Sequence, residues 1–121
     1  MIDEIKLHER TCIDLGIGTG FHSLGLGEIF ENLEKLHGWE LIEDHGVNKI
    51  IKKYKFSNFK ESLEFVNKIG EIAESQKHHP EINVGYSHVE IKIYTHRING
   101  LSMNDFIIAA KVDKMLETFG I

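Results

Sequence analysis

The chain has little proline, little cysteine and no long apolar run, and each shortage excludes a class of protein. Among its 121 residues there is one proline, Pro80, and one cysteine, Cys12. A single cysteine cannot close an intrachain disulfide, and it excludes a zinc site built from several cysteines. No apolar stretch is long enough to cross a bilayer as a helix, so we expect no membrane span.

The first ten residues do not resemble a targeting segment. They mix Asp3, Glu4 and Glu9 with Lys6 and Arg10 and lack a continuous apolar core. A secretory signal needs that core, and a transit peptide is poor in acidic residues. Because a lone cysteine also fits a reducing compartment, we expect a cytoplasmic protein.

Positive charge is not in excess. The chain has 14 Lys and Arg residues against 19 Asp and Glu residues, a formal net charge of -5. Proteins that bind the phosphate backbone concentrate Lys and Arg in a patch. The densest basic run, residues 49–55, alternates with apolar residues and predicts the solvent face of a strand. We therefore expect no direct binding to nucleic acid.

The length of the chain predicts one domain with a single core. Residues 1–22 show no clear hydrophobic period, and glycines crowd the stretch around their end. We expect an N-terminal arm over residues 1–22 that is flexible or weakly packed, followed by one domain over residues 23–121.

The first half of that domain predicts a helix, a hairpin and a long helix. A helix-spaced apolar pattern starts at Leu26 and ends near Gly38, where a positive φ is expected. Residues 39–43 and 48–56 alternate around a turn at residues 44–46, which predicts an antiparallel hairpin. Asn58 and Glu61 form a capping box for a helix that ends between residues 75 and 77. Its expected inward stripe consists of Phe59, Leu63, Val66, Ile69 and Ala73.

The second half predicts two strands and a final helix. Ile82 and Val84 indicate a short strand, and residues 89–95 give the clearest alternation in the chain. Ser102 and Asp105 form a second capping box that opens the last helix. The order αββαββα has too few crossovers for a parallel sheet. The predicted fold is therefore α+β, a four-stranded antiparallel sheet with three helices packed on one face.

Six polar residues and one proline form the most informative pattern in the chain. Their order is Glu74, then His78-His79-Pro80, then Tyr86, then His96 and Asp105. Imidazoles transfer protons near neutral pH because their unperturbed pKa lies close to it. Each of these residues by itself is more often an ordinary surface residue, but chance is a poor explanation for the whole set.

The spacing of this set resembles the signature of the pterin-4a-carbinolamine dehydratases. The neighbouring Thr95-His96 and Gly100-Leu101-Ser102 are similar to the family as well, and the resemblance covers roughly residues 24–116. It implies the same α+β architecture, a pterin substrate, no cofactor, no metal and assembly as a homodimer or homotetramer. It also implies a link to an aromatic amino acid hydroxylase through tetrahydrobiopterin recycling.

The resemblance implies a role for each motif residue. We expect His78 and His96 to be the acid/base pair and His79 to orient the pterin, with Thr95 and Pro80 as supporting residues. Glu74 lies one helical turn before His78, so we expect these two side chains to share a face. Asp105 is expected to meet His96 across the loop at residues 97–101. Tyr86 is expected to form a wall of the cleft.

Three alternatives are set against this hypothesis. Residues 12–20 resemble the glycine loop of S-adenosylmethionine-dependent methyltransferases, but no run of alternating strands and helices follows them. His78, His79 and His96 could bind a metal with Glu74 or Asp105, and spacing alone does not exclude this. Known relatives of the fold also act as non-catalytic dimerisation or assembly modules, so the fold alone does not establish activity.

Overall fold

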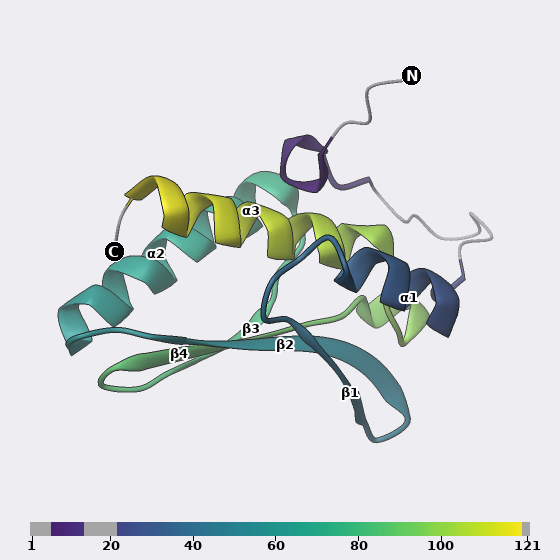
Figure 1. The fold of residues 1–121 in the computed structure, drawn as a ribbon, viewed down its shortest axis with the longest axis horizontal. Coiled ribbons are helices and arrows are strands. Elements are labelled where there is room, and N and C mark those ends of the chain that lie inside the picture. Colours follow the sequence, from purple (N-terminus) through teal and green to yellow (C-terminus); the bar gives the residue numbers. More distant parts are fainter. Residues whose placement is uncertain (1–5, 14–21, 120–121) are drawn as a thin grey trace.

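The computed structural model describes residues 6–13 and 22–119, and its helices lie together on one side of an antiparallel sheet (Figure 1). The helices are α1 (Leu26–Leu33), α2 (Phe59–Gln76) and α3 (Met103–Phe119). The strands are β1 (Glu40–Asp44), β2 (Val47–Lys55), β3 (Glu81–Val84) and β4 (His88–Ile93), in the order β1-β2-β4-β3. All neighbouring strands are antiparallel. The predicted α+β fold and its αββαββα order are confirmed, and two short 3-10 helices, η1 (Leu7–Glu9) and η2 (His96–Ile98), are additional.

The first hairpin forms around the predicted turn. Asp44 pairs with Val47 across it, and the two residues between them, His45 and Gly46, have φ angles of 52° and 80°. Positive φ at both central positions belongs to the tight turn whose twist matches that of paired strands. The sequence pattern therefore places this hairpin within one residue of its observed ends.

The predicted capping box of α2 forms with one difference: the Glu61 carboxylate accepts from the amide of Ser57 instead of that of the N-cap residue Asn58. Asn58 Oδ1 accepts a hydrogen bond of 2.9 Å from the Glu61 amide, and Glu61 Oε1 accepts one of 2.8 Å from the Ser57 amide. The inward stripe differs from the prediction. Phe59 and Leu63 are 44% and 40% exposed, and the buried residues of α2 are Ser62, Phe65, Ile69 and Ala73.

The orientation of α2 is set by the sheet beneath it. The ring centroid of Phe65 lies 4.7 Å from that of Tyr54 and 5.0 Å from that of Phe56. The helix has apolar residues over about half of its circumference, so the periodicity admits more than one inward face. The aromatic contacts with β2 and the residue after it select the face that carries Phe65.

The core lies between the helices and the inner face of the sheet. Val89, Ile91 and Ile93 of β4 are fully buried, as are Phe106 and Ile108 of α3. The described part of the N-terminal arm joins this core, because Leu7 is buried and Lys111 Nζ donates a hydrogen bond of 2.9 Å to the His8 carbonyl. Residues 6–13 therefore contact α3, and the division into an arm over residues 1–22 and a domain over residues 23–121 stays a prediction. Residues 1–5 and 14–21 lie outside the described residues.

The basic run on β2 is only partly a solvent face. Lys53 and Lys55 are exposed as predicted, but Lys49 is buried. Its Nζ lies 3.0 Å from Asp44 Oδ2 and 4.3 Å from the ring centroid of Tyr94. The hydrogen bond from Lys49, together with one from His45, lowers the pKa of Asp44 to about 2. Within the described residues, no helix combines the length and apolar character needed to cross a membrane.

Candidate active site

The end of α2 determines where the His78-His79 pair lies. Lys77 ends the helix in the left-handed conformation, with φ 54° and ψ 38°, and the His78 amide donates back to the Ala73 carbonyl at 3.2 Å. Pro80 follows and leads into β3, which begins at the next residue. The chain therefore leaves the helical path before His78, and the two imidazoles do not continue the helix face.

His78 is held by a buried carboxylate from α3. Its Nε2 lies 2.6 Å from Asp105 Oδ1, and the side chains of His78 and Asp105 are 13% and 0% exposed. An ionised carboxylate only accepts hydrogen bonds, so Nε2 carries the hydrogen in this pair. The neutral ring is then left with Nδ1 as its acceptor nitrogen.

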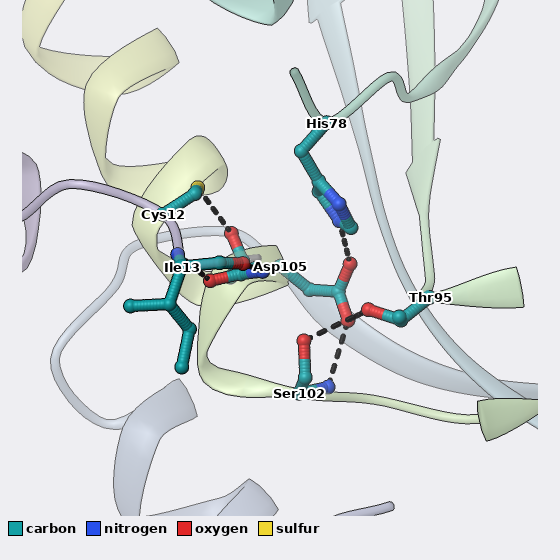
Figure 2. Close-up of polar contacts among 7 residues, drawn as sticks. Cys12, Ile13, His78, Thr95, Ser102 and Asp105 are labelled. Atoms are coloured by element: carbon teal, nitrogen blue, oxygen red, sulfur yellow. Dashed lines mark hydrogen bonds and ion pairs between the residues drawn. The ribbon is translucent and has the colours of Figure 1, made fainter. Parts of the chain in front are cut away.

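Asp105 is itself fixed by the start of α3 and the end of the sheet (Figure 2). Its Oδ2 accepts hydrogen bonds of 2.8 Å from the Ser102 amide and from Thr95 Oγ1. The Thr95 and Ser102 hydroxyls lie 2.8 Å from each other. A buried carboxylate with this many donors keeps a defined position, and it holds the imidazole of His78 in one orientation.

His79 has a different environment. Its Nε2 lies 2.5 Å from Glu74 Oε2, and the two side chains are 60% and 79% exposed. Solvent screens such a pair strongly, so it contributes little to stability. The contact restrains the direction of the ring without burying it.

His96 is paired with an aromatic residue of the same strand extension. Its Nδ1 lies 2.8 Å from the Tyr94 hydroxyl, and the two ring centroids are 4.2 Å apart. When the hydroxyl donates to Nδ1, the neutral ring carries its hydrogen on Nε2. His96 and His78 then present opposite capacities, a donor nitrogen and an acceptor nitrogen.

The three imidazoles line one pocket of about 540 Å³. Pockets for small organic ligands have volumes of roughly 300 to 1,000 Å³. Three segments provide the walls: the end of α2 with His78 and His79, the end of the sheet with Thr95 and His96, and the N-terminal residues 11–13. The predicted convergence of the three histidines is confirmed, while their chemical roles stay predictions.

Two carboxylates contact a different histidine from the one expected. Glu74 meets His79 instead of His78, because the helix has already ended at Gln76 and the spacing of four residues no longer describes a shared face. Asp105 meets His78 instead of His96. Thr95 points toward the carboxylate and donates to its other oxygen, and because Thr95 is extended, the next side chain, that of His96, points to the opposite side.

Tyr86 is not a wall of this pocket. It is 70% exposed and lies in the turn between β3 and β4. This turn is at the opposite end of β4 from His96, and the six residues of β4 at about 3.3 Å each separate its ends by roughly 20 Å. The expectation for Tyr86 is therefore wrong for the pocket described here.

Sequence reasoning missed several residues that line the pocket, and Tyr94, Asn104 and Cys12 are three of them. Tyr94 had a signal, since residues two apart on an extended strand point the same way and Tyr94 precedes His96 by two. Asn104 and Cys12 line the pocket as well, and they are 92 residues apart. No local pattern connects them. Burial raises the pKa of the Cys12 thiol to about 11, with the charge of Asp105 adding to the shift, so the thiol is neutral near pH 7.

The metal alternative has no ligand set in the described part of the chain. Among residues 6–13 and 22–119, no three His, Cys, Asp or Glu side chains lie close enough to hold an ion. Each imidazole has its own partner, which is a buried carboxylate for His78, an exposed carboxylate for His79 and a phenol for His96.

Comparison with known proteins identifies the family. Residues 23–115 match the family described as Pterin 4 alpha carbinolamine dehydratase. The chain belongs to this family. Membership makes it a dehydratase, and the match leaves out the N-terminal residues that line the pocket.

Individual relatives agree with this result. A protein from Rubrobacter xylanophilus is 46% identical over 90 residues, which cover 74% of this chain and 81% of the relative. One from Alkaliphilus metalliredigens is 42% identical over 110 residues, 90% of this chain and 95% of the relative. The names of both place them among the pterin-4-alpha-carbinolamine dehydratases.

Solved structures share the fold. A Brucella melitensis protein described as a transcriptional coactivator/pterin dehydratase matches with a TM-score of 0.71 and 30% identity, over 78% of this chain and 98% of that one. A pterin dehydratase-like protein described as a RuBisCO assembly factor of the alpha-carboxysome matches with a TM-score of 0.56 and 21% identity, over 65% and 89%. The second match shows the fold alone.

Proposed function

We propose that this dehydratase removes water from 4a-hydroxytetrahydropterin to give quinonoid dihydropterin by histidine general acid/base catalysis. The observation that carries the proposal is the single pocket lined by His78, His79 and His96. The reaction consists of two proton transfers and the breaking of one C–O bond. Positioned imidazoles are sufficient for such a reaction, so no cofactor and no metal are needed.

The partners of the imidazoles support a division of roles. His96 acts as the imidazolium: its Nδ1–H donates to the Tyr94 hydroxyl oxygen, and its Nε2 gives a proton to the hydroxyl on C4a, which leaves as water while the ring becomes neutral. His78 accepts the proton of N5, and the electron pair of the N5–H bond forms the N5–C4a double bond. Asp105 stabilises the imidazolium that this step creates on His78, since the two groups are 2.6 Å apart. No electrons enter or leave.

His79 and the remaining motif residues act in support. His79 is directed by Glu74 and lies exposed on the pocket wall, which suits a residue that orients the bicyclic substrate. Thr95 acts through Asp105, and Pro80 ends the turn that carries both imidazoles. The proposed setting is cytoplasmic tetrahydrobiopterin recycling, linked to an aromatic amino acid hydroxylase that forms the carbinolamine.

We also propose assembly into a homodimer or homotetramer. Four apolar or aromatic side chains are exposed beside the edge strand β3, and they are Phe59, Leu63, Val84 and Tyr86. Ser62 Oγ lies 3.3 Å from the Tyr86 carbonyl, which places the start of α2 next to the β3–β4 turn. Exposed apolar side chains near a sheet edge fit contact with a second copy of the chain.

The decisive test is a stopped-flow measurement of 4a-carbinolamine decay. The carbinolamine should disappear faster at micromolar enzyme than in buffer, with the rate proportional to enzyme concentration. A protein lacking both His78 and His96 is the matched control. If the wild-type protein does not accelerate the decay, the hypothesis of a non-catalytic dimerisation or assembly module remains.

A further inference from the structure

The N-terminal residues Thr11, Cys12 and Ile13, here named the strap, form a wall of the pocket although they lie outside the family match. They are separated from the nearest family residue in sequence by residues 14–22. A segment that lines a pocket can contact a bound ligand, whether or not it belongs to the region that the family match covers. What holds the strap in place decides whether it is a true wall.

The strap is held by two amide side chains. Asn104 Oδ1 accepts a hydrogen bond of 3.0 Å from the Ile13 amide, and Asn104 Nδ2 donates one of 2.8 Å to the Ile13 carbonyl. Gln76 Oε1 accepts a hydrogen bond of 2.8 Å from the Cys12 amide. Asn104 is only 4% exposed with the strap in place, and the Ile13 backbone pairs with both its carbonyl oxygen and its amide nitrogen. The docked position is therefore favoured.

The strap is anchored beside the residue that holds His78 (Figure 2). Asn104 and Asp105 are consecutive in the first turn of α3, and they contact the strap and His78 respectively. The Cys12 thiol also contacts the Asn104 carbonyl at 3.7 Å. One helical turn thus places the strap and the proposed N5 base on neighbouring walls of the pocket.

We infer that the strap contacts the substituent on C6 of the pterin and determines which substituents bind well. This rests on the proposed function, in which His78 takes the proton of N5. Carbon 6 is bonded directly to N5, so a substituent on it projects from the ring edge that faces His78. The strap offers the Thr11 hydroxyl, the Cys12 thiol and the Ile13 methyl groups, and none of these carries a charge. They fit a short hydroxylated chain better than an ionised one.

The test uses the Asn104→Leu variant, which keeps the number and branching of the side-chain heavy atoms and removes both hydrogen bonds to Ile13. The substrates are the carbinolamines of tetrahydrobiopterin, which has a dihydroxypropyl group on C6, and of 6-methyltetrahydropterin. Loss of both hydrogen bonds should raise KM for the first substrate at least about threefold more than KM for the second. Equal KM changes for the two substrates would overturn the inference.

A second variant adds bulk to the wall without touching its anchors. Ile13 is 56% exposed, so Ile13→Trp should fold normally and hinder the dihydroxypropyl substrate more than the methyl one. Leu26→Trp is the matched control, because Leu26 is 57% exposed and does not line the pocket. If Ile13→Trp and Leu26→Trp show the same KM for both substrates, the strap is not a wall for the substituent.

A readout that needs no turnover separates this inference from the proposed function. Cys12 is the only cysteine of the chain, so its alkylation rate reports on the strap alone. Asn104→Leu should raise that rate, and saturating 7,8-dihydrobiopterin should lower it in the wild type more than 6-methyl-7,8-dihydropterin does. If the protein is inactive but still shows this shielding, the proposed dehydratase activity is wrong and the contact between the strap and the C6 substituent is supported. If the enzyme is active but Cys12 is alkylated at the same rate in the presence of either pterin, the strap does not contact the C6 substituent.

Discussion

His78 is the motif histidine with the most rigid surroundings. Its partner Asp105 is fully buried and accepts hydrogen bonds from two further donors, whereas the partner of His79 is an exposed glutamate. An imidazole with a fixed carboxylate partner has a defined tautomer and gains stabilisation when it takes up a proton. The three histidines of the motif are therefore not equivalent, although the sequence presents them alike.

The first prediction concerns the proposed acid/base pair. His78→Ala and His96→Ala should each lower kcat at least about tenfold, because removing one positioned proton-transfer group typically costs about 10²- to 10⁴-fold. His79→Ala should mainly raise KM. Stopped-flow kinetics with circular dichroism as a check on folding would measure this.

His45→Asn is the control for these variants. His45 is 98% exposed in the β1–β2 turn and has a positive φ, which asparagine tolerates. Its kinetics should equal those of the wild type. Wild-type turnover in both His78→Ala and His96→Ala would refute the assignment.

At the scale of the element, the end of α2 controls the direction of the His78-His79 pair. Lys77 has φ 54°. A β-branched residue such as valine would be strained in this conformation. Pro80 alone predicted that the helix ends near this point, but it did not predict the left-handed residue. That residue explains why Glu74 meets His79 and not His78.

The second prediction tests this turn. Lys77→Val should lower the free energy of unfolding by about 1 to 3 kcal/mol, the usual cost of a strained backbone conformation, and should lower kcat because both imidazoles are displaced. Lys77→Gly should keep the activity. Urea unfolding and stopped-flow kinetics on the same samples would give both quantities. Lys60→Val on the exposed side of α2 is the control, and an equal loss of stability there would show that valine and not the turn is responsible.

At the scale of the whole molecule, one buried cluster ties the sheet to α3. Asp113 Oδ1 accepts a hydrogen bond of 2.5 Å from the Tyr54 hydroxyl, and Asp113 Oδ2 accepts one of 2.9 Å from Trp39 Nε1. Burial, followed by the nearby charge of Asp113, raises the pKa of Tyr54 well above its ordinary value of 10.0. This cluster makes the fold sensitive to alkaline pH.

The third prediction follows from that shift. Above pH 10 the unfolded chain loses the Tyr54 proton while the folded chain keeps it, so the stabilisation is complete below pH 10 and declines as pH rises further. The stability difference between the wild type and Tyr54→Phe should therefore narrow from pH 9 to pH 11. Urea unfolding across this range would measure it. Tyr86→Phe changes a 70% exposed position, so its free energy of unfolding should change with pH as that of the wild type does. A difference between Tyr54→Phe and the wild type that stays constant from pH 9 to pH 11 would contradict the prediction.

The fourth prediction concerns assembly. Leu63→Glu places a charge in the exposed patch beside β3 and should shift the protein toward the monomer in analytical ultracentrifugation. Glu64→Leu removes a charge elsewhere on the same helix and is the comparison variant. A wild type that is monomeric at all concentrations would disprove the proposed dimer or tetramer. The patch also gives an account of why Phe59 and Leu63, predicted to face inward, are exposed.

The sequence by itself determined the elements and the family. Helix caps, turn residues and the alternation of β4 depend on interactions between residues a few positions apart, so Asn58 with Glu61 and His45 with Gly46 could be read directly. The spacing of the motif from Glu74 to Asp105 was sufficient to indicate the family that the comparison established.

The tertiary structure alone decided which residues far apart in the sequence contact each other. His78 and Asp105 are 27 residues apart, and Ile13 and Asn104 are 91 residues apart. Such pairs form only after helices and sheet have packed, and packing depends on the shapes of many side chains at once, as the selection of the Phe65 face of α2 shows. Local periodicity carries no information about those shapes, which is why the partners of Glu74 and Asp105 and the position of the strap could not be predicted.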